Sequence, residues 1–258
     1  MKSLFLLLFN SITLFSQSGY DIAKQIDNRS VPKNISTHIV MTLENSRGYI
    51  RKNKMISKSK DRNSKQIIWF IEPKDDKGVA FLKLEQPDKD IQMKMWLPAF
   101  KKVRRITAKR KGDSFMGSDL SFEDLSTRVF DDYDYTFIKD TLYNDQKASL
   151  LEIKPRAEIK SSYSKHIAIV DKSQFLTKEE LSFNNKGVLE KKKIFSYSKI
   201  DAYFIVDEIF IVDMLKDHST LVQFSNFKLD DEINNNLSGE NFYFLIKIFI
   251  YKKKVMLF

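Results

Sequence analysis

The chain has 258 residues, a formal net charge of +10 and no cysteine. The absence of cysteine excludes disulfides, thiolate metal sites and cysteine nucleophiles, whereas this length with 42% hydrophobic residues can supply one large folded core. The positive charge favours anionic partners, but the sequence has no RNA- or DNA-binding motif, so we expect no nucleic-acid partner.

The first 18 residues, MKSLFLLLFNSITLFSQS, predict a secretory signal peptide. Lys2 precedes an apolar run from Leu4 to Phe15, and the small residues Ser16 and Ser18 follow where a cleavage site is expected. The run is shorter than the roughly 20 residues that span a bilayer. A buried N-terminal helix is the alternative interpretation. We therefore expect an exported protein.

One short amphipathic helix and a series of strands are predicted after the signal. In GYDIAKQIDNRS, Ile22, Ala23 and Ile26 share one helical stripe. Further along, segments rich in β-branched and aromatic residues recur between turn residues. The strands are predicted at residues 36–44, 47–60, 65–73, 78–85, 91–99, 101–109, 134–143, 148–155, 163–171, 176–184, 188–200, 203–215 and 219–229.

The short connections between these segments are typical of an antiparallel meander. Met93, Met95 and Leu97 alternate with more polar neighbours, so one face of the sheet is expected to be apolar and the other hydrated. Because one helix cannot cover so large a sheet, the sheet is expected to curl. The predicted fold class is mainly β: an unclosed antiparallel β-barrel with a short N-terminal helix and a lid loop. One domain, residues 19–241, precedes an atypical apolar and basic tail, residues 242–258.

No catalytic motif is recognisable in the sequence. His38, His166 and His218 lie far apart, each in a strand-like segment, and none has the spacing of a metal site. Acidic pairs occur, but such pairs are usually solvated loop residues. We therefore predict no catalytic residue, no metal site and no cofactor, and we do not expect an enzyme.

The segment KKVRRITAKRKGDSFMGSDLSFEDL, residues 101–125, combines a basic strand with an acidic loop. One interpretation is a solvated sheet edge that its cations protect from aggregation. The other is a latch, in which Arg104 or Arg105 holds the loop through bidentate pairing. The loop carboxylates considered for that pairing include Asp119, Glu123 and Asp124.

Two large apolar residues occupy the polar, glycine-rich part of the same loop. Phe115 and Met116 lie between Gly112 and Gly117. Apolar side chains in such a loop need an apolar place to bind, and the mouth of a curled sheet offers one. The loop is therefore predicted to be a lid, with Phe115 and Met116 as its plug and the two glycines as its hinges.

Several segments resemble the LolA-like outer-membrane lipoprotein-sorting protein family. They are IIWFIEPKDDKGVAFLKL, MWLPAFKKVRRI, GDSFMGSDLSFEDL and the later YSKHIAIVDKSQFLTKEELSFNNKGVLEKK, and the resemblance extends from about Gly19 to about Leu237. Lys94 departs from the family pattern, which tends to have an aromatic residue there, and the C-terminal tail is not the short family ending. The resemblance implies an unclosed barrel with helices at its mouth, an apolar cavity, and periplasmic carriage of acylated cargo.

The function expected from these observations is that of a periplasmic, monomeric carrier for the acyl chains of lipoproteins or lipids. Its partners would be an inner-membrane transporter, an outer-membrane acceptor and, transiently, the membrane surface. The alternative is a non-catalytic accessory that docks on an export complex or an anionic membrane through its basic patch. The residues expected to line the cavity, unless they only fill an ordinary core, are Ile68, Phe70, Met93, Met95 and Leu97.

Overall fold

The computed structural model of the protein describes residues 18–86 and 89–231. This part of the chain contains one α-helix, three short 3₁₀ helices and one sheet of 13 strands. The elements are α1 (Gly19–Asp27), β1 (Ile35–Glu44), β2 (Ile50–Lys60), β3 (Lys65–Glu72), β4 (Ala80–Gln86), β5 (Lys89–Leu97), η1 (Pro98–Phe100), β6 (Lys102–Ile106), η2 (Ala108–Arg110), η3 (Phe130–Asp132), β7 (Tyr133–Tyr143), β8 (Gln146–Pro155), β9 (Tyr163–Asp171), β10 (Thr177–Asn184), β11 (Leu189–Ile200), β12 (Tyr203–Asp213) and β13 (His218–Leu229).

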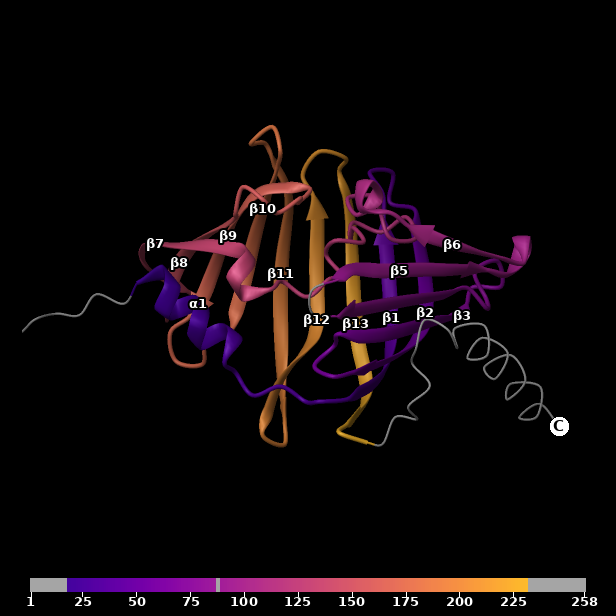
Figure 1. The fold of residues 1–258 in the computed structure, drawn as a ribbon, viewed down its shortest axis with the longest axis horizontal. Coiled ribbons are helices and arrows are strands. Elements are labelled where there is room, and N and C mark those ends of the chain that lie inside the picture. The colour runs from indigo at the N-terminus through magenta and orange to yellow at the C-terminus, as the bar shows by residue number, and fades with distance from the viewer. Residues whose placement is uncertain (1–17, 87–88, 232–258) are drawn as a thin grey trace, which may run out of the picture.

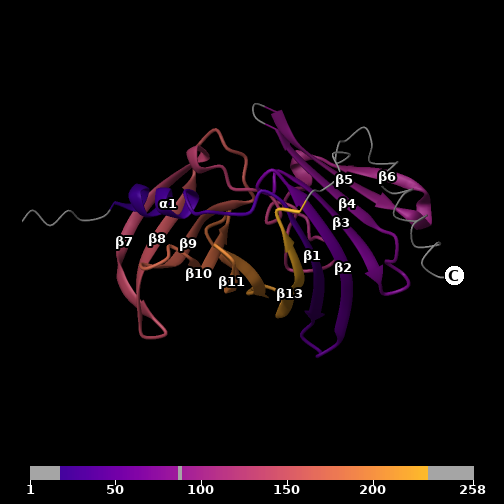
Figure 2. The same ribbon diagram turned by 90° about the horizontal axis from the view of Figure 1, so that it is seen from below.

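The predicted fold class is confirmed: the sheet is antiparallel throughout and does not close. Its strand order is β6-β5-β4-β3-β2-β1-β13-β12-β11-β10-β9-β8-β7, so β6 and β7 are its two edges. Pairing of β1 with β13 joins the early strands to the late ones. Both ends of the sheet curl toward the same side, which leaves a concave face between them (Figures 1 and 2). Strong sheet twist and curling are expected for so many strands.

The main core lies on the concave face of strands β1 to β6, β12 and β13. Alternate residues of each strand point into it, as a pleated strand requires, and the core residues are mostly aliphatic, methionine and phenylalanine. Those from the strands are Ile39, Met41, Leu43, Met55, Ile68, Phe70, Phe81, Met93, Met95, Ile106, Ile211 and Val222.

The opposite face of β3 and β4 is buried, contrary to the expected alternation of an apolar and a hydrated face. Ile67, Trp69 and Leu82 form a second apolar cluster there, and Trp96 packs against it. The difference arises because β3 and β4 are almost continuously apolar, a pattern typical of strands that are buried on both faces.

Helix α1 packs beside the opposite edge of the sheet. Ser18 and Asp21 form a capping box at its N-terminus, and Ile22 and Ala23 are buried in a third cluster with residues of β8 and β9. Gly19 lies so close to β7 that a Cβ atom there would be 2.5 Å from the backbone nitrogen of Phe137. In the described ranges, no helix has both the length and the apolar content needed to cross a membrane.

Two predicted segments are not part of this description. Residues 1–17 of the predicted signal peptide and the predicted tail, residues 242–258, lie outside the described residues.

Candidate functional site

The connection between β6 and β7, residues 107–132, crosses the concave face of the sheet. These consecutive strands are the two opposite edges, so the connection has to traverse one face of the sheet. On its way it contacts the interior at several places: the backbone oxygen of Leu125 accepts a hydrogen bond from the buried Lys83 on β4, and the backbone nitrogen of Thr127 donates one to Glu85. The topology requires the traverse, and these contacts show that it runs over the concave side of the sheet.

Residues 111–123 of this connection form a small hairpin. Ser114 pairs with Ser121 in an isolated bridge, and the backbone nitrogen of Phe115 donates to the oxygen of Leu120 at 2.7 Å. At the tip, Met116 and Gly117 have φ angles of 53° and 81°. Positive φ at both central residues is the signature of a type I′ turn, which is why a glycine is suited to this position.

The hairpin inserts apolar side chains into the main core. Phe115 is 2% exposed, and its ring centroid lies 5.3 Å from that of Phe81 and 5.9 Å from that of Phe70. Leu120 and Phe122 are buried in the same cluster. From here on, the plug means Phe115, Leu120 and Phe122. Of the two residues predicted to form it, Phe115 is a member, whereas Met116 packs against the cluster only partly buried.

The structure brings the plug together with the residues predicted to line a cavity. Ile68, Phe70, Met93 and Met95 belong to the same cluster as Phe115, and both Leu97 and Met116 pack against it partly buried. The predicted apolar interior is occupied by the plug rather than open, because the hairpin folds inward and fills the space between the curled ends of the sheet.

The two glycines that were predicted as hinges lie at opposite ends of the hairpin. Gly117 lies in the turn at the tip of the hairpin. Gly112 lies at its base, where an added Cβ would be 3.1 Å from the Cβ atom of Ser162. A side chain at residue 112 would therefore push against the segment that precedes β9.

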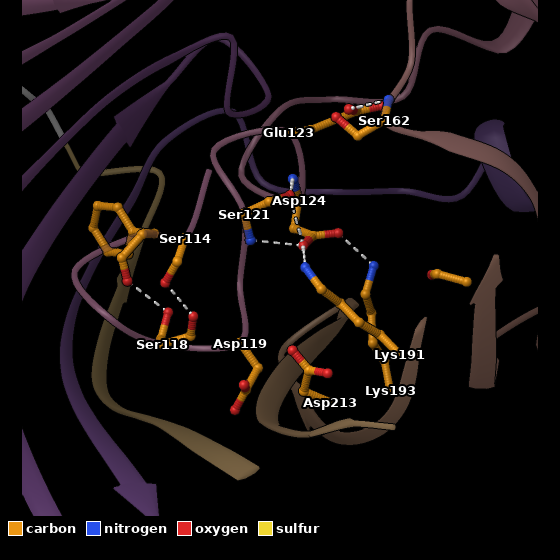
Figure 3. A network of polar contacts seen from close by, with 12 residues as sticks. Ser114, Ser118, Asp119, Ser121, Glu123, Asp124, Ser162, Lys191, Lys193 and Asp213 are labelled. Carbon is orange, nitrogen blue, oxygen red and sulfur yellow. Dashed lines mark hydrogen bonds and ion pairs between the residues drawn. The ribbon is translucent and has the colours of Figure 1, made fainter. Parts of the chain in front are cut away.

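A buried carboxylate fastens the hairpin to the sheet. The Asp124 side chain is 4% exposed, and its two oxygens lie 3.1 Å from Lys191 Nζ and 2.5 Å from Lys193 Nζ, both on β11 (Figure 3). The Tyr163 hydroxyl donates to the same carboxylate at 3.0 Å, and the backbone nitrogen of Ser121 donates at 2.8 Å. We call Asp124 with Lys191 and Lys193 the latch.

The charges of the latch stabilise one another. Burial alone would raise the pKa of Asp124, but the positive charges of Lys193 and Lys191 outweigh it and hold this pKa well below its usual range. Burial would likewise lower the pKa of Lys193, yet the carboxylates of Asp124 and Glu180 raise it. Asp124 and Lys193 are therefore both charged near neutral pH.

The other two predicted loop carboxylates add further attachments. Asp119 accepts from the Thr220 hydroxyl at 2.6 Å and lies 2.7 Å from Nδ1 of His218, both on β13. Glu123 accepts from the backbone nitrogen of Ser162 at 2.8 Å and from the Ser161 hydroxyl. The hairpin is thus held by polar contacts on both of its sides.

The predicted pairing of these carboxylates with Arg104 or Arg105 is not formed. Both arginines are exposed on the edge strand β6, where Arg104 lies opposite Met95 and Arg105 opposite Lys94. The loop continues past β6 into the interior, so its acidic end reaches β11 and β13 instead. The sequence carried a usable signal, because alternation places Lys191 and Lys193 on the same face as Phe195, and lysines on such a face require partners.

A cavity of about 300 Å³ lies beside the latch. Its lining is mixed, with the apolar residues Leu120, Phe195, Val206 and Ile209 beside polar ones. The polar residues include Asp124, Arg128, Tyr163, His166, Glu180 and Lys193.

Glu180 contacts three other polar residues of this lining. Its carboxylate lies 2.9 Å from Arg128, 3.3 Å from Lys193 Nζ and 3.4 Å from His166 Nδ1. Burial opposes ionisation of Glu180, but the charge of Arg128 lowers its pKa well below the ordinary value.

His166 is expected to make the protein less stable in mild acid. Burial, aided by the charges of Arg128 and Lys193 and opposed by Glu180, lowers its pKa to about 3 from an ordinary 6.5. Below pH 6.5 the unfolded chain takes up a proton that the folded chain does not, so the free energy of unfolding falls by up to about 1.4 kcal/mol per pH unit. Urea denaturation between pH 7 and pH 5 should show this fall in the wild type and a flatter profile in His166→Gln.

The matched control for this prediction is His38→Gln, because His38 is exposed. It should retain the wild-type slope. If His166→Gln and the wild type lose stability at the same rate over this pH range, His166 is not held neutral in the folded protein.

Comparisons with known proteins support the fold and the family. A family model with the description "Uncharacterized protein" matches residues 62–242, well over half of the chain. No curated protein sequence matches the chain.

Three solved structures are similar. A "putative outer membrane lipoprotein-sorting protein domain" from Vibrio parahaemolyticus is 26% identical, with a TM-score of 0.81 over 89% of this chain and 98% of that one. A DUF1329 family protein from Desulfovibrio piger is also 26% identical, with a TM-score of 0.81 over 86% of this chain and 96% of that one. A LolA superfamily protein from Nitrosomonas europaea shares the fold at 16% identity, with a TM-score of 0.70 over 87% of this chain and 99% of that one.

The unclosed 13-stranded sheet, the family match and the two structures at 26% identity agree with one another, and the chain belongs to the LolA-like outer-membrane lipoprotein-sorting protein family.

Proposed function

We propose that this protein is a periplasmic carrier that binds the acyl chains of lipoproteins or lipids in the space now filled by the plug. The observation that supports this most directly is the position of Phe115, which is buried against Phe70 and Phe81 although it belongs to a connecting hairpin and not to the sheet. An acyl chain offers the same apolar contacts as the plug. It can therefore replace the plug without leaving the sheet lining exposed.

The energetic balance favours such an exchange. Burying an acyl chain contributes roughly 0.8 kcal/mol per methylene, so a lipid with two or more chains can compensate for displacing three side chains. Met93 and Met95 line the space, and methionine adapts readily to cargo of different shapes. The hairpin is the part that can move, because a few polar side-chain contacts hold it in place. The strands around it are held by the continuous backbone hydrogen bonds of the sheet.

The proposed partners are an inner-membrane transporter that supplies the cargo and an outer-membrane acceptor that receives it. Transfer of this kind requires no covalent chemistry. The periplasmic location is supported by the predicted signal peptide and by the lipoprotein-sorting description of the structure from Vibrio parahaemolyticus.

A reversible disulfide across the base of the hairpin tests the proposal. A Cβ atom at residue 112 would lie 3.1 Å from the Cβ atom of Ser162, close to the separation of roughly 3.5–4.5 Å in natural disulfides. Because the chain has no cysteine of its own, Gly112→Cys with Ser162→Cys can form only this bond within one molecule. The oxidised variant should lose binding of a fluorescent acylated peptide, and reduction with dithiothreitol should restore it.

The two single-cysteine variants are the controls, and neither should respond to dithiothreitol. An oxidised double variant that binds the acylated peptide as well as the reduced form would refute displacement of the hairpin. Wild-type protein that ignores acylated peptides and lipids altogether, and that carries no lipid in native mass spectrometry after purification from the periplasm, would refute the carrier function.

A second function, docking on an anionic membrane surface, is favoured by the exposed cations at the sheet edge. Lys101, Lys102, Arg104 and Arg105 are all exposed at or beside the start of β6. Changing all four to glutamate should abolish sedimentation with vesicles that contain phosphatidylglycerol and leave acylated-peptide binding unchanged. Loss of peptide binding with retained vesicle binding would instead assign these residues to the cargo site.

A further inference from the structure

We propose that the latch is a receptor for an anionic headgroup: the phosphate of a bound lipid replaces the Asp124 carboxylate on Lys191 and Lys193 when the hairpin withdraws. This inference rests on the proposed carrier function and specifies its ligand.

The plug and the Asp124 carboxylate of the latch belong to one short segment. Asp124 follows the plug residue Phe122 by two positions, so withdrawal of the plug also withdraws the carboxylate from Lys191 and Lys193. Both lysine side chains are at most 7% exposed. A buried cation that loses its partner is strongly unfavourable. An open form of the protein therefore requires a replacement anion at this place.

The charges that remain after withdrawal favour an anion. Glu180 is shared between Lys193, at 3.3 Å, and Arg128, at 2.9 Å. Among the described residues, Glu180 is then the carboxylate that still pairs with Lys193 and Arg128, while Lys191 loses its ion pair and keeps Asp213 opposite it in the strand register. The loss of one buried negative charge beside these cations favours an incoming anion.

The cavity beside the latch gives the headgroup a place that is continuous with the apolar interior. Leu120 and Ile209 line the cavity and also pack in the main core cluster. An amphiphile can therefore place its chains where the plug now lies and its headgroup beside Lys193. The cavity volume of about 300 Å³ adds to the space that the hairpin itself vacates.

A phosphate can take the place of the Asp124 carboxylate on this set of donors. Lys191 Nζ is within 2.9 Å of the Tyr163 hydroxyl, and both groups now contact the same oxygen of Asp124, while Lys193 contacts the other oxygen. Three donors thus converge on one anion. The several oxygens of a phosphate can accept from all three at once.

The test compares two lipids with identical acyl chains, phosphatidic acid and diacylglycerol, by titration into the delipidated wild-type protein. Wild type should bind phosphatidic acid at least about tenfold more tightly, which is the scale of one or two charge-assisted hydrogen bonds. Lys193→Gln should lose most of that preference while still binding diacylglycerol. The matched control is Lys192→Gln, because Lys192 points to the opposite face and pairs with Glu179 at 3.0 Å, and it should keep the full preference.

Each alternative result has a distinct meaning. Equal affinity of the wild type for the two lipids, or an unchanged preference in Lys193→Gln, overturns the headgroup site but leaves the carrier function intact. Failure of both lipids to bind also overturns the headgroup site, and failure of the acylated peptide as well overturns the carrier function itself. Inorganic phosphate is the third ligand: if it binds alone as tightly as phosphatidic acid, the site is one for free phosphate and the lipid assignment is wrong.

Discussion

Asp124→Asn is expected to lower the free energy of unfolding by about 3–5 kcal/mol, the usual effect of removing one partner from a buried ion pair. The substitution keeps the size of the side chain but leaves Lys191 and Lys193 buried without the charge that they share. Urea denaturation at pH 7 measures this difference. The same variant should bind acylated ligands at a lower concentration than the wild type, because the hairpin is then held less firmly.

The matched control lies in the same hairpin. Asp113 pairs with Arg110 at 2.6 Å, but these side chains are 43% and 49% exposed. Asp113→Asn should therefore change the free energy of unfolding by less than about 1 kcal/mol.

The pH dependence provides an independent check on the same prediction. The pKa of Asp124 is lowered in the folded protein, so its contribution is present above its ordinary value of 3.8 and is lost as the pH falls further. The difference between wild type and Asp124→Asn should shrink below that pH. A difference at pH 7 no larger than that of Asp113→Asn would show that the latch does not hold the hairpin.

Phe115→Ala is expected to have two opposite effects, on stability and on binding. Removing a buried phenylalanine ring typically lowers the free energy of unfolding by about 3–5 kcal/mol, and Phe115 contacts Phe70, Phe81 and Phe122. The same change vacates part of the proposed acyl site. Titration calorimetry well below the melting temperature should therefore show tighter binding of a single-chain acyl ligand.

The control for Phe115→Ala is Phe100→Ala, because Phe100 is 69% exposed in η1. It should change neither stability nor binding appreciably. If Phe115→Ala is destabilised but binds acyl ligands no better, Phe115 is an ordinary core residue and not a plug.

The sequence was sufficient for the elements of the fold. The alternation of apolar and polar residues is a local property, so it predicted the helix at residues 19–27 and each of the 13 strands to within a few residues. It also predicted that Met93, Met95 and Phe115 share an apolar environment, because large apolar side chains must be buried together.

The sequence was not sufficient for the partners of the charged groups. One of its two interpretations of the basic strand placed the carboxylates of the loop beside Arg104 or Arg105, which are close in the chain, whereas the structure pairs Asp124 with lysines that are 67 and 69 residues away. Ion pairs of this kind depend on which strands are neighbours after the sheet curls. No local pattern contains that information.

The sequence by itself therefore determined the secondary structure and the apolar character of the loop tip, since periodicity and burial fix these without reference to distant residues. The unclosed barrel was implied by the resemblance to the LolA-like family. Only the tertiary structure decided that the plug occupies the interior and that Asp124 bridges Lys191 and Lys193. The physical reason is that β6 and β7 are the opposite edges of one curled sheet, so the segment between them has to traverse the sheet, and its apolar side chains are buried on the concave face.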